Sequence, residues 1–330
     1  MNMKPSMNKV ETKSSPPPDV AAMRFQPRDD QLLRAIHELG GVLAKRQIKD
    51  MLWPAKSSRA MEKRLAKLYH HGYIRWPERE HWRREPVPES VCWLGWRGIM
   101  RLAETLGLGL EHVATANENQ LRKLEVSLRR QGLQWMREPR WIQLEHDIAV
   151  VDFRLHLNEA LRGLQTLTLS EWWPERVFRS DMDVVEFEAE GRDGSTRRAK
   201  KGVCPDAYFV LDDERRRLGG EPYRARFLLE LDNATHDNPS FGFEKALPGA
   251  AYVGSAAYKK RFGHNSGRWL IVTTAGERRM EHLMLQTESR LGPRAGLFYF
   301  TTFEQVKSRN LLMTGIWLQG GHREPVALIS

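Results

Sequence analysis

The stretch FLLELDNATH, residues 227–236, decides how the second half of this chain is expected to fold. An apolar run bounded by polar, turn-forming residues is typical of a buried strand. Alternate residues of a strand share a face, so Leu228, Glu230 and Asp232 lie on one face and the intervening apolar residues on the other. The stretch therefore predicts a buried strand that ends with two carboxylates on one face.

A second apolar segment, CPDAYFVLD at residues 204–212, precedes this strand, and Gly219–Gly220 lies midway between the two. If the segments pair as a hairpin centred on Gly219, Asp206 lies opposite Asp232, and Glu230 is one pair along. Cross-strand partners lie about 4.5–5.5 Å apart. This register predicts that three carboxylates converge on one patch.

Clustered carboxylates repel one another and burial raises their pKa values, so a positive partner is expected beside them. Mg²⁺ prefers oxygen ligands and commonly uses one or two carboxylates plus substrate phosphates. Asp206, Glu230 and Asp232 are therefore the candidate metal ligands and catalytic residues, with Mg²⁺ as the expected cofactor. The chemistry that fits them is metal-assisted phosphodiester cleavage. The competing interpretation is that these strand-end acids face solvent or cap the next turn.

A nearby lysine is expected to stabilise developing charge or to help activate the attacking water. Lys245, in the segment NPSFGFEKALPGAAYVG, is the candidate catalytic lysine, and Lys259–Lys260 are alternatives. Two histidines also stand near the acidic segments. For His146 a buried core role is favoured over one in the cluster, and for His236 simple exposure is favoured over metal ligation.

The remaining pattern of the second half favours a mixed sheet with helices on its faces. A long amphipathic helix is predicted over residues 140–163, and a helix over about 277–288. A basic loop, GSTRRAKKG, is predicted at 194–202. Further strands are predicted near 166–172, 184–188, 267–274 and 295–302.

The N-terminal block predicts three helices followed by a hairpin, the order of a winged helix-turn-helix. RDDQLLRAIHELGG and AKRQIKDMLW give the first two helices, and SSRAMEKRLAKLYHHG gives the third, which begins at Ser57 or Ser58 and ends at Gly72. YIRW (73–76) and VCWL (91–94) flank a charged tip. In such modules the third helix enters the major groove and the hairpin touches the backbone.

Basic residues gather on this predicted module. The chain carries a net charge of +10, and residues 44–86 alone hold twelve Lys or Arg against five Asp or Glu, a net +7. Met61, Leu65 and Leu68 form one face of the third helix, and basic side chains take the other. The candidate DNA-binding residues are Arg59, Lys63, Arg64, Lys67, His70, Arg79, Arg83 and Arg84. A solvated surface or a protein-binding face is the alternative.

The rest of the sequence sets broad limits. No apolar run approaches the roughly 18 residues that a membrane span needs, and the N-terminus lacks a secretory h-region. Cys92 and Cys204 have no metal-binding spacing and suggest no disulfide framework, which fits a reducing cytoplasm. The predicted organisation is a disordered leader at 1–25, a winged helix at 26–112, a helical linker at 113–139 and an α/β domain at 140–330.

Two resemblances follow from these pieces. Pro205–Asp206 with Glu230–Leu231–Asp232 resembles the restriction-endonuclease-like superfamily, whose PD-(D/E)xK core has lysine where this chain has Asp232. Some members carry the lysine on the following helix, which suits Lys245, although Pro248 and Gly249 favour a break there. RLAKLYHHGYI, WLGWRGIMRL, LEHDIAVVDFRLHL, PDAYFVL and FLLELDNATH, in that order, resemble the replication-relaxation family, over roughly residues 27–275.

The resemblance implies a cytoplasmic DNA-binding protein of a mobile element, active in plasmid replication or mobilisation. One hypothesis is a Mg²⁺-dependent DNA endonuclease or nickase. A second is a non-catalytic DNA-binding regulator or accessory factor with a degenerate nuclease fold. A third is a scaffold that recruits a relaxase or a replication protein. Winged-helix proteins often form homodimers, and no zipper pattern in the sequence decides this.

Overall fold

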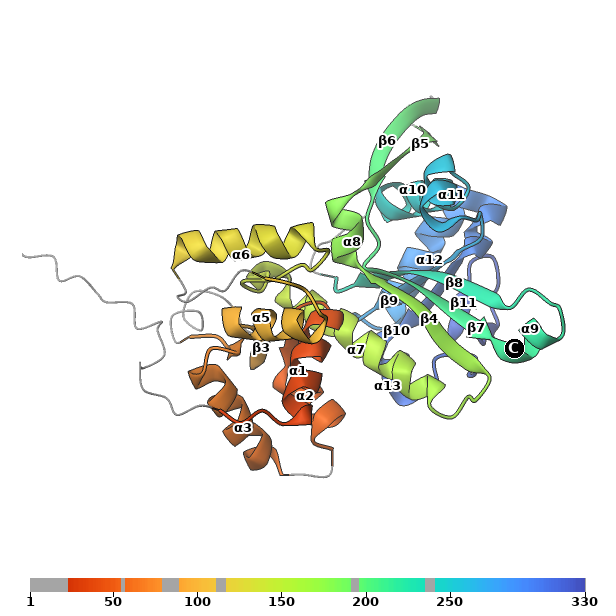
Figure 1. Cartoon of the computed structure of the whole chain (residues 1–330). Helices are drawn as coiled ribbons and strands as arrows, with labels where there is room; N and C mark the ends of the chain where they lie inside the picture. Colours follow the sequence, from red (N-terminus) through yellow and green to blue (C-terminus); the bar gives the residue numbers. More distant parts are fainter. Residues whose placement is uncertain are drawn as a thin grey trace, which may run out of the picture. The chain divides into compact units, whose positions relative to one another are not determined.

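The computed structural model describes residues 23–54, 57–78, 89–110, 117–190, 196–234 and 241–329 (Figure 1). The chain divides into two compact units, Met1–Leu144 and Glu145–Ser330. Most of the leader predicted at residues 1–25 lies outside the described residues, as do Arg79, Arg83 and Arg84 at the tip of the predicted wing and the loop residue His236.

The first unit packs helices against a small antiparallel sheet with strand order β1-β3-β2. Its elements are α1 (Pro27–Glu38), β1 (Val42–Ala44), α2 (Lys45–Leu52), α3 (Ser58–His70), β2 (Ile74–Arg75), β3 (Val91–Leu94), α5 (Trp96–Thr105), α6 (Glu118–Arg130) and η1 (Trp141–Gln143). Helices α1, α2 and α3 followed by strands β2 and β3 occur in the order that the sequence predicts.

The two faces of helix α3 differ in burial. Met61, Leu65 and Leu68 recur at helical spacing and are buried in the core of the first unit, as predicted. The helix begins after Ser57, and Gly72 ends it with a φ of 75°, a left-handed conformation that glycine adopts without strain. Most of the polar residues of α3, among them Arg59, Lys63 and Lys67, are left on the outer face.

The second unit begins with α7 (Leu144–Leu161), which is followed by a strand-rich segment. That segment contains β4 (Leu167–Pro174), α8 (Glu175–Ser180), β5 (Asp183–Glu190), β6 (Thr196–Val203), β7 (Ala207–Asp213), α9 (Glu214–Leu218) and β8 (Arg224–Asp232). The rest of the unit contains η2 (Gly242–Ala246), α10 (Leu247–Val253), α11 (Ala256–Phe262), β9 (Arg268–Thr273), α12 (Glu277–Leu291), η3 (Gly292–Leu297), β10 (Phe298–Thr302), α13 (Phe303–Ser308), β11 (Trp317–Gln319) and β12 (Pro325–Val326).

A mixed sheet forms the centre of the second unit, as predicted. Within the described residues it has seven strands in the order β12-β11-β10-β9-β8-β7-β4. β8, β9 and β10 are parallel to one another, and the outer pairs are antiparallel. β7 and β8 read as continuous apolar runs because both faces of the sheet are covered.

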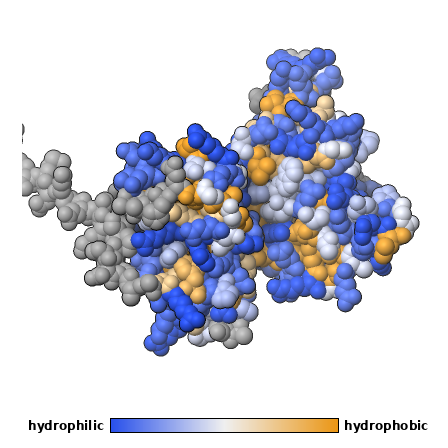
Figure 2. Space-filling model, viewed as in Figure 1, coloured by the Kyte–Doolittle hydropathy of each residue, from blue (hydrophilic) through white to orange (hydrophobic). Residues whose placement is uncertain are grey.

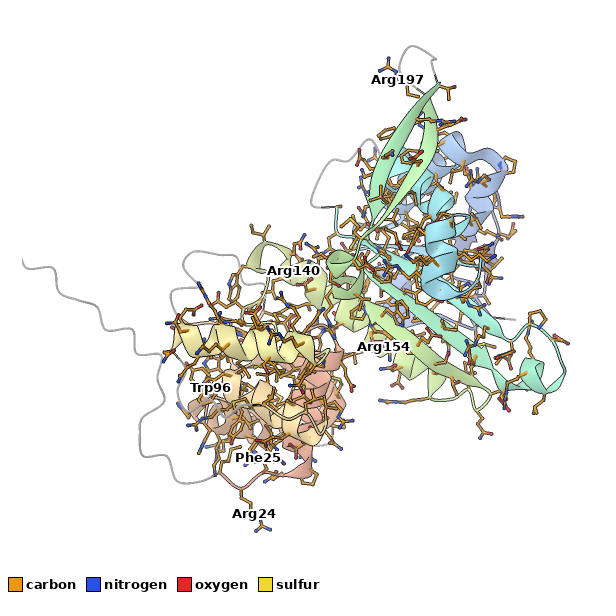
Figure 3. All side chains as sticks on the ribbon, turned by 45° about the horizontal axis from the view of Figure 1, so that its top comes forward. Arg24, Phe25, Trp96, Arg140, Arg154 and Arg197 are labelled. Atoms are coloured by element: carbon orange, nitrogen blue, oxygen red, sulfur yellow. The ribbon has the colours of Figure 1, made fainter. Side chains whose placement is uncertain are left out.

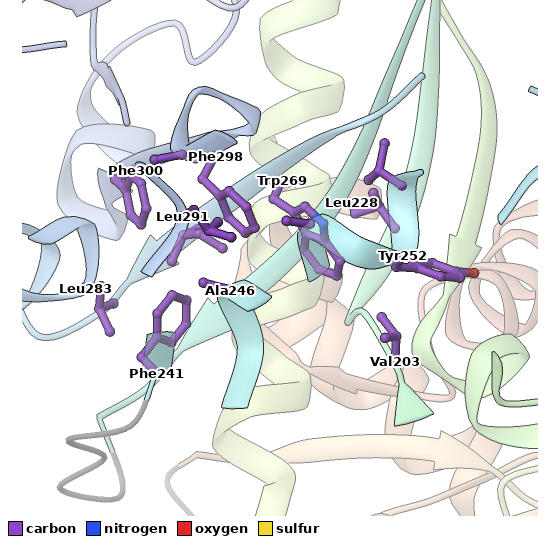
Figure 4. Close-up of a cluster of buried hydrophobic side chains, with 14 of the residues drawn as sticks. Val203, Leu228, Phe241, Ala246, Tyr252, Trp269, Leu283, Leu291, Phe298 and Phe300 are labelled. Atoms are coloured by element: carbon purple, nitrogen blue, oxygen red, sulfur yellow. The ribbon is translucent and has the colours of Figure 1, made fainter. Parts of the chain in front are cut away.

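The alternation predicted for β8 holds on the two faces of this sheet. Leu228 joins the apolar cluster that α10, α11 and α12 cover, together with Trp269 and Phe298 (Figure 4). Phe227 and Leu229 join the opposite cluster, under α7 and α13. Burying one such side chain contributes about 1.5–3 kcal/mol, so a register slip that exchanged the two faces would be costly.

Of the segment predicted as a basic loop at residues 194–202, the described residues, from Thr196 on, lie in strand β6, so the loop prediction is wrong for them. β6 pairs with β5 in a separate two-stranded ribbon, with Phe187 opposite Ala199. Figure 3 shows this ribbon extending from the unit with Arg197 near its free end. Cross-strand partners of opposite charge, such as Glu186 and Lys200, stabilise the pairing of a segment whose own composition suggested a loop.

Candidate functional site

Asp206 and Glu230 lie opposite each other where β7 begins and β8 nears its end. Ala207 pairs with Leu229, so the next position along brings Asp206 beside Glu230, and the Asp206 backbone N–H donates to the Leu229 carbonyl at 2.9 Å. The predicted register, with Asp206 opposite Asp232, is therefore wrong. The helical turn α9 occupies the connection before the two glycines, and the pairing is centred on residue 218 rather than on residue 219.

The Asp206 carboxylate is held by two donors from different segments. His146, in the first turn of α7, lies with its Nε2 2.9 Å from Oδ1, and the backbone N–H of Leu231 donates to Oδ2 at 2.7 Å. Burial acts to raise the pKa of Asp206, but the His146 charge and hydrogen bond hold it below its ordinary value. Burial acts to lower the pKa of His146, and Asp206 outweighs it and raises that pKa to about 9.

Glu230 is paired with Lys245, whose Nζ lies 2.5 Å from Oε1. Burial raises the pKa of the Glu230 carboxyl to about 7, with Lys245 acting in the opposite direction. The Glu230 charge in turn raises the pKa of Lys245 against the effect of its own burial. The Glu230 side chain is only 12% exposed whereas that of Lys245 is 45% exposed, so the lysine forms the accessible end of the pair.

Lys245 lies in a π-helical turn, η2, which runs directly into α10. Single π turns are rare and occur often at functional sites. The helix break suggested by Pro248 and Gly249 does not occur, because Pro248 falls in the first turn of α10, where a missing backbone N–H costs little. The wider turn that precedes it carries Lys245 to Glu230.

Asp232 lies apart from this group in its contacts. Its two carboxylate oxygens accept from the guanidinium of Arg279, on α12, at 3.0 Å each, and Thr273 Oγ1 donates to one of them at 2.8 Å. A bidentate arginine–carboxylate pair of this kind is strong and fixed in direction. The structure thus brings together Asp206, Glu230 and Lys245, while Asp232 ties the end of β8 to α12.

The carboxylate pair is the part of the site that fits a divalent cation. Asp206 and Glu230 are buried, come from neighbouring strands and offer the hard oxygen donors that Mg²⁺ selects. Across the described residues, no group of three or more His, Cys, Asp or Glu side chains is placed to hold a metal ion. A cation here would thus take its protein ligands from this pair, and its remaining positions from water and substrate.

The basic residues predicted for DNA binding divide into two groups in the first unit. Arg59, Lys63, Lys67 and His70 are exposed on the outer face of α3. Arg64 is turned inward: its Nε donates to Asp29 Oδ1 at 2.8 Å and its Nη2 to the Arg24 carbonyl. Because Asp29 is completely buried, Arg64 holds α3 against α1.

His146 is the residue of this cluster that sequence reasoning underrated. The predicted order of elements gave no sign that the first turn of α7 passes the start of β7, since the two are 60 residues apart. The available signal was a histidine between two acids at the start of a helical stretch that then becomes apolar, LEHDIAVV. That signal fits a buried structural histidine equally well.

Fold and site together define a mixed α/β protein with a buried carboxylate pair, a lysine and a histidine at one end of a sheet strand. The chain belongs to the replication-relaxation family, whose profile matches residues 33–263. The match includes α3 of the first unit as well as Asp206, Glu230 and Lys245 of the second. Membership points to a role in the replication or mobilisation of a mobile genetic element.

No curated protein matches this chain in sequence. Among the described helices, none combines the length and the apolar character that crossing a bilayer requires. The outer surface in the view of Figure 2 is largely hydrophilic on both units.

Proposed function

We propose that this protein binds DNA through its first unit and hydrolyses phosphodiester bonds with its second, as a Mg²⁺-dependent endonuclease or nickase. The observation that carries the proposal is the meeting of Asp206, Glu230 and Lys245 at one strand end, with His146 fixing Asp206. These side chains come from four separate segments of the chain, and a carboxylate pair beside a lysine is the arrangement that phosphodiester cleavage needs.

Each residue of the group has a distinct task in this proposal. Asp206 and Glu230 would hold the divalent cation, which when bound polarises a phosphoryl oxygen and lowers the pKa of a bound water. Lys245 reaches from the exposed side of Glu230 and stabilises the charge that develops on the phosphate oxygens. His146 keeps the Asp206 carboxylate in a single orientation, so its role is positioning.

The first unit supplies the DNA-binding surface in this proposal. Arg59, Lys63, Lys67 and His70 stand exposed on α3, the third helix of the unit, and each lies about one helical turn from the next. The third helix is the one that enters the major groove in winged-helix modules. The proposal therefore assigns DNA contacts to this outer face and excludes Arg64, which is bound to Asp29.

Nicking of supercoiled plasmid in the presence of Mg²⁺ tests the enzymatic part. Glu230→Gln keeps the shape of the side chain and removes its charge, and Lys245→Met removes the cation. We expect each to lower the nicking rate by at least about 100-fold, the usual cost of losing one preorganised charge. EDTA should abolish nicking by the wild type.

Matched variants exclude effects of surface charge alone. Glu281→Gln, on the exposed face of α12, and Lys307→Met, on the exposed face of α13, change the same charges and should nick at the wild-type rate. Thermal melting checks that all four variants are folded. Equal nicking by wild type, Glu230→Gln and Lys245→Met would remove the enzymatic proposal.

A second candidate function is favoured by the charge balance of the cluster. Two anions, Asp206 and Glu230, meet two cations, His146 and Lys245, at hydrogen-bonding distance, so the group is stable without a metal ion. The second unit then has a nuclease-like arrangement retained for structure, and the protein is a DNA-binding regulator or an accessory factor that recruits a relaxase or a replication protein. Gel shifts of DNA without Mg²⁺-dependent nicking would support this candidate.

A further inference from the structure

A pocket of about 140 Å³ opens beside the Glu230–Lys245 pair in the second unit. Met182 and Lys245 line its mouth, and their side chains are 46% and 45% exposed. The interior is formed by Val203, Trp269 and Phe298, which are almost completely buried. The pocket is therefore reached from the same side as Lys245 and leads into the apolar cluster drawn in Figure 4.

The walls of the pocket come from separate elements that the sheet brings together. Residues at the base of the β5–β6 ribbon form one wall, and Pro248 and Gly249 of α10 form another. Gly249 allows the indole to lie close to α10, because a Cβ at this position would lie 3.1 Å from the Trp269 ring. The indole Nε1 donates to the Gly249 carbonyl at 3.0 Å, and its ring stacks on Phe298 with an interplanar angle of 7°.

The chemistry of the pocket differs between its interior and its mouth. The interior is apolar and partly aromatic. At the mouth lie two ion pairs, Lys201–Glu244 and Lys245–Glu230. An apolar interior with a few charged groups at the entrance suits a ligand that has a flat, weakly polar ring attached to a charged group.

The size of the pocket restricts that ring. An apolar cavity of about 150 Å³ lined by aliphatic and aromatic side chains accommodates one benzene ring. A pocket of about 140 Å³ therefore matches a single six-membered ring more closely than the fused rings of a purine.

We propose that this pocket binds a pyrimidine base of a nucleic-acid strand, the base next to the phosphate that Lys245 contacts. This assignment extends the proposed function and depends on it, because that function places a nucleic-acid strand at Lys245. A base can enter only when it has left the helical stack, which costs least in single-stranded DNA. The pocket then gives the second unit a preference for unpaired pyrimidines beside its carboxylate pair.

Equilibrium binding of short fluorescent oligonucleotides to the full chain in EDTA tests the proposal without any cleavage step. The wild type should bind oligo(dT) at least about fivefold more tightly than an abasic strand of the same length, the lower end of what contacts between a base and aromatic side chains supply. Oligo(dA) should bind like the abasic strand. Equal affinity of the wild type for oligo(dT) and the abasic strand would overturn the proposal.

Two tryptophan substitutions near the start of β5 test whether the preference for oligo(dT) arises in the pocket. Met182→Trp fills the mouth of the pocket and should abolish the preference for oligo(dT) while leaving affinity for the abasic strand unchanged. Val184→Trp is the matched control: Val184 is 60% exposed, lies two residues further on and does not line the pocket. It should retain the preference. Retention of the preference by Met182→Trp would place the base elsewhere and refute the assignment.

Alkylation of Cys204 gives a second readout that needs no substitution in the pocket. The chain has two cysteines: Cys204 lines the pocket and is partly exposed, and Cys92 is completely buried in the first unit. Because the Cys204 thiol is only partly exposed, slow labelling at mildly alkaline pH is expected. Saturating oligo(dT) should slow that labelling several-fold, and the abasic strand should not. Equal rates of Cys204 labelling with oligo(dT) and with the abasic strand would contradict binding of a base in the pocket.

These readouts separate the pocket from the enzymatic proposal. If plasmid nicking is absent while oligo(dT) binds preferentially and protects Cys204, the nuclease assignment fails and the base pocket stands. If nicking depends on Glu230 but the wild type treats oligo(dT) and the abasic strand alike, the nuclease assignment stands and the pocket assignment fails.

Discussion

At the scale of single residues, the cluster shows how burial and pairing set the state of each ionisable group. Glu230 and Asp206 have opposite pKa shifts although they are neighbours. Burial dominates for Glu230 and raises its pKa, whereas the His146 charge outweighs burial for Asp206 and lowers its pKa. Two carboxylates that differ in this way have different tendencies to carry a proton near neutral pH.

A separate half-buried carboxylate, Asp183, supports a prediction about acid stability. Its Oδ2 accepts from the Arg261 Nε at 2.5 Å and from the Tyr252 hydroxyl at 2.6 Å. Burial acts to raise the pKa of Asp183, but these two donors hold it below its ordinary value of 3.8. A carboxyl whose pKa is lower in the folded state than in the unfolded chain stabilises the fold at pH values above its pKa in the unfolded chain. That contribution is lost as pH falls through the folded pKa.

Asp183→Asn should therefore lower the free energy of unfolding by about 2 kcal/mol at neutral pH, the usual worth of a charged hydrogen-bonded group. The gap between the two proteins should stay constant down to about pH 4 and shrink below it. Urea unfolding at a series of pH values measures this gap. Asp181→Asn is the control, since Asp181 contacts the same arginine but its side chain is 86% exposed. A gap that stays constant down to pH 3 would contradict the prediction.

At the scale of elements, the position of Lys245 depends on how η2 packs against α12. Gly242, the first residue of η2, approaches α12 closely: a Cβ there would lie 2.8 Å from the Gln286 carbonyl oxygen and 2.8 Å from Arg290 Cγ. The carbonyl belongs to the helix backbone and cannot move aside as a side chain does. The glycine thus allows the close approach of the two helical segments.

Gly242→Ala should push η2 away from α12 and lower the free energy of unfolding by about 1–3 kcal/mol, the typical cost of overpacking. Gly254→Ala, after the other end of the same helical segment, is the matched control, because its added Cβ would meet the nearest atom at 3.9 Å. Chemical denaturation compares the two variants. Equal stability of Gly242→Ala and Gly254→Ala would show that η2 does not rely on this contact.

At the scale of the whole molecule, net charge governs the expected behaviour with DNA. The chain has 52 Lys and Arg against 42 Asp and Glu, and the exposed face of α3 concentrates part of this excess. Many basic residues elsewhere are paired with acids, as Arg137 is with Glu118 and Arg323 with Glu288. If α3 binds DNA as proposed, its exposed basic residues are the ones expected to release counterions from phosphates.

Arg59→Ala combined with Lys63→Ala should weaken DNA binding and lower the slope of log Kd against log salt concentration by about 2, near 0.9 for each lost phosphate contact. Fluorescence anisotropy over a range of salt concentrations measures the slope. Arg129→Ala with Arg130→Ala removes the same charge from the exposed side of α6 and should leave the slope unchanged. An unchanged slope in the Arg59 and Lys63 variant would show that α3 does not contact the backbone.

The sequence by itself determined most of the buried strands and the mixed sheet, and it singled out the two carboxylates that meet, Asp206 and Glu230. Periodicity carries that information locally: the run FLLELD predicts β8 with Glu230 on one face, and the spacing of Met61, Leu65 and Leu68 predicts the buried side of α3. The family resemblance needed only the order of such pieces along the chain, and the match over residues 33–263 confirms it.

Only the tertiary structure decided which charged groups meet. The turn α9 set the register that pairs Asp206 with Glu230 rather than with Asp232, and Arg279 bound Asp232 from a helix 47 residues away. His146 and Lys245 reached the carboxylates through α7 and η2. Periodicity fixes the face on which a side chain lies, but contacts between distant segments depend on connection geometry and packing, which local sequence does not encode.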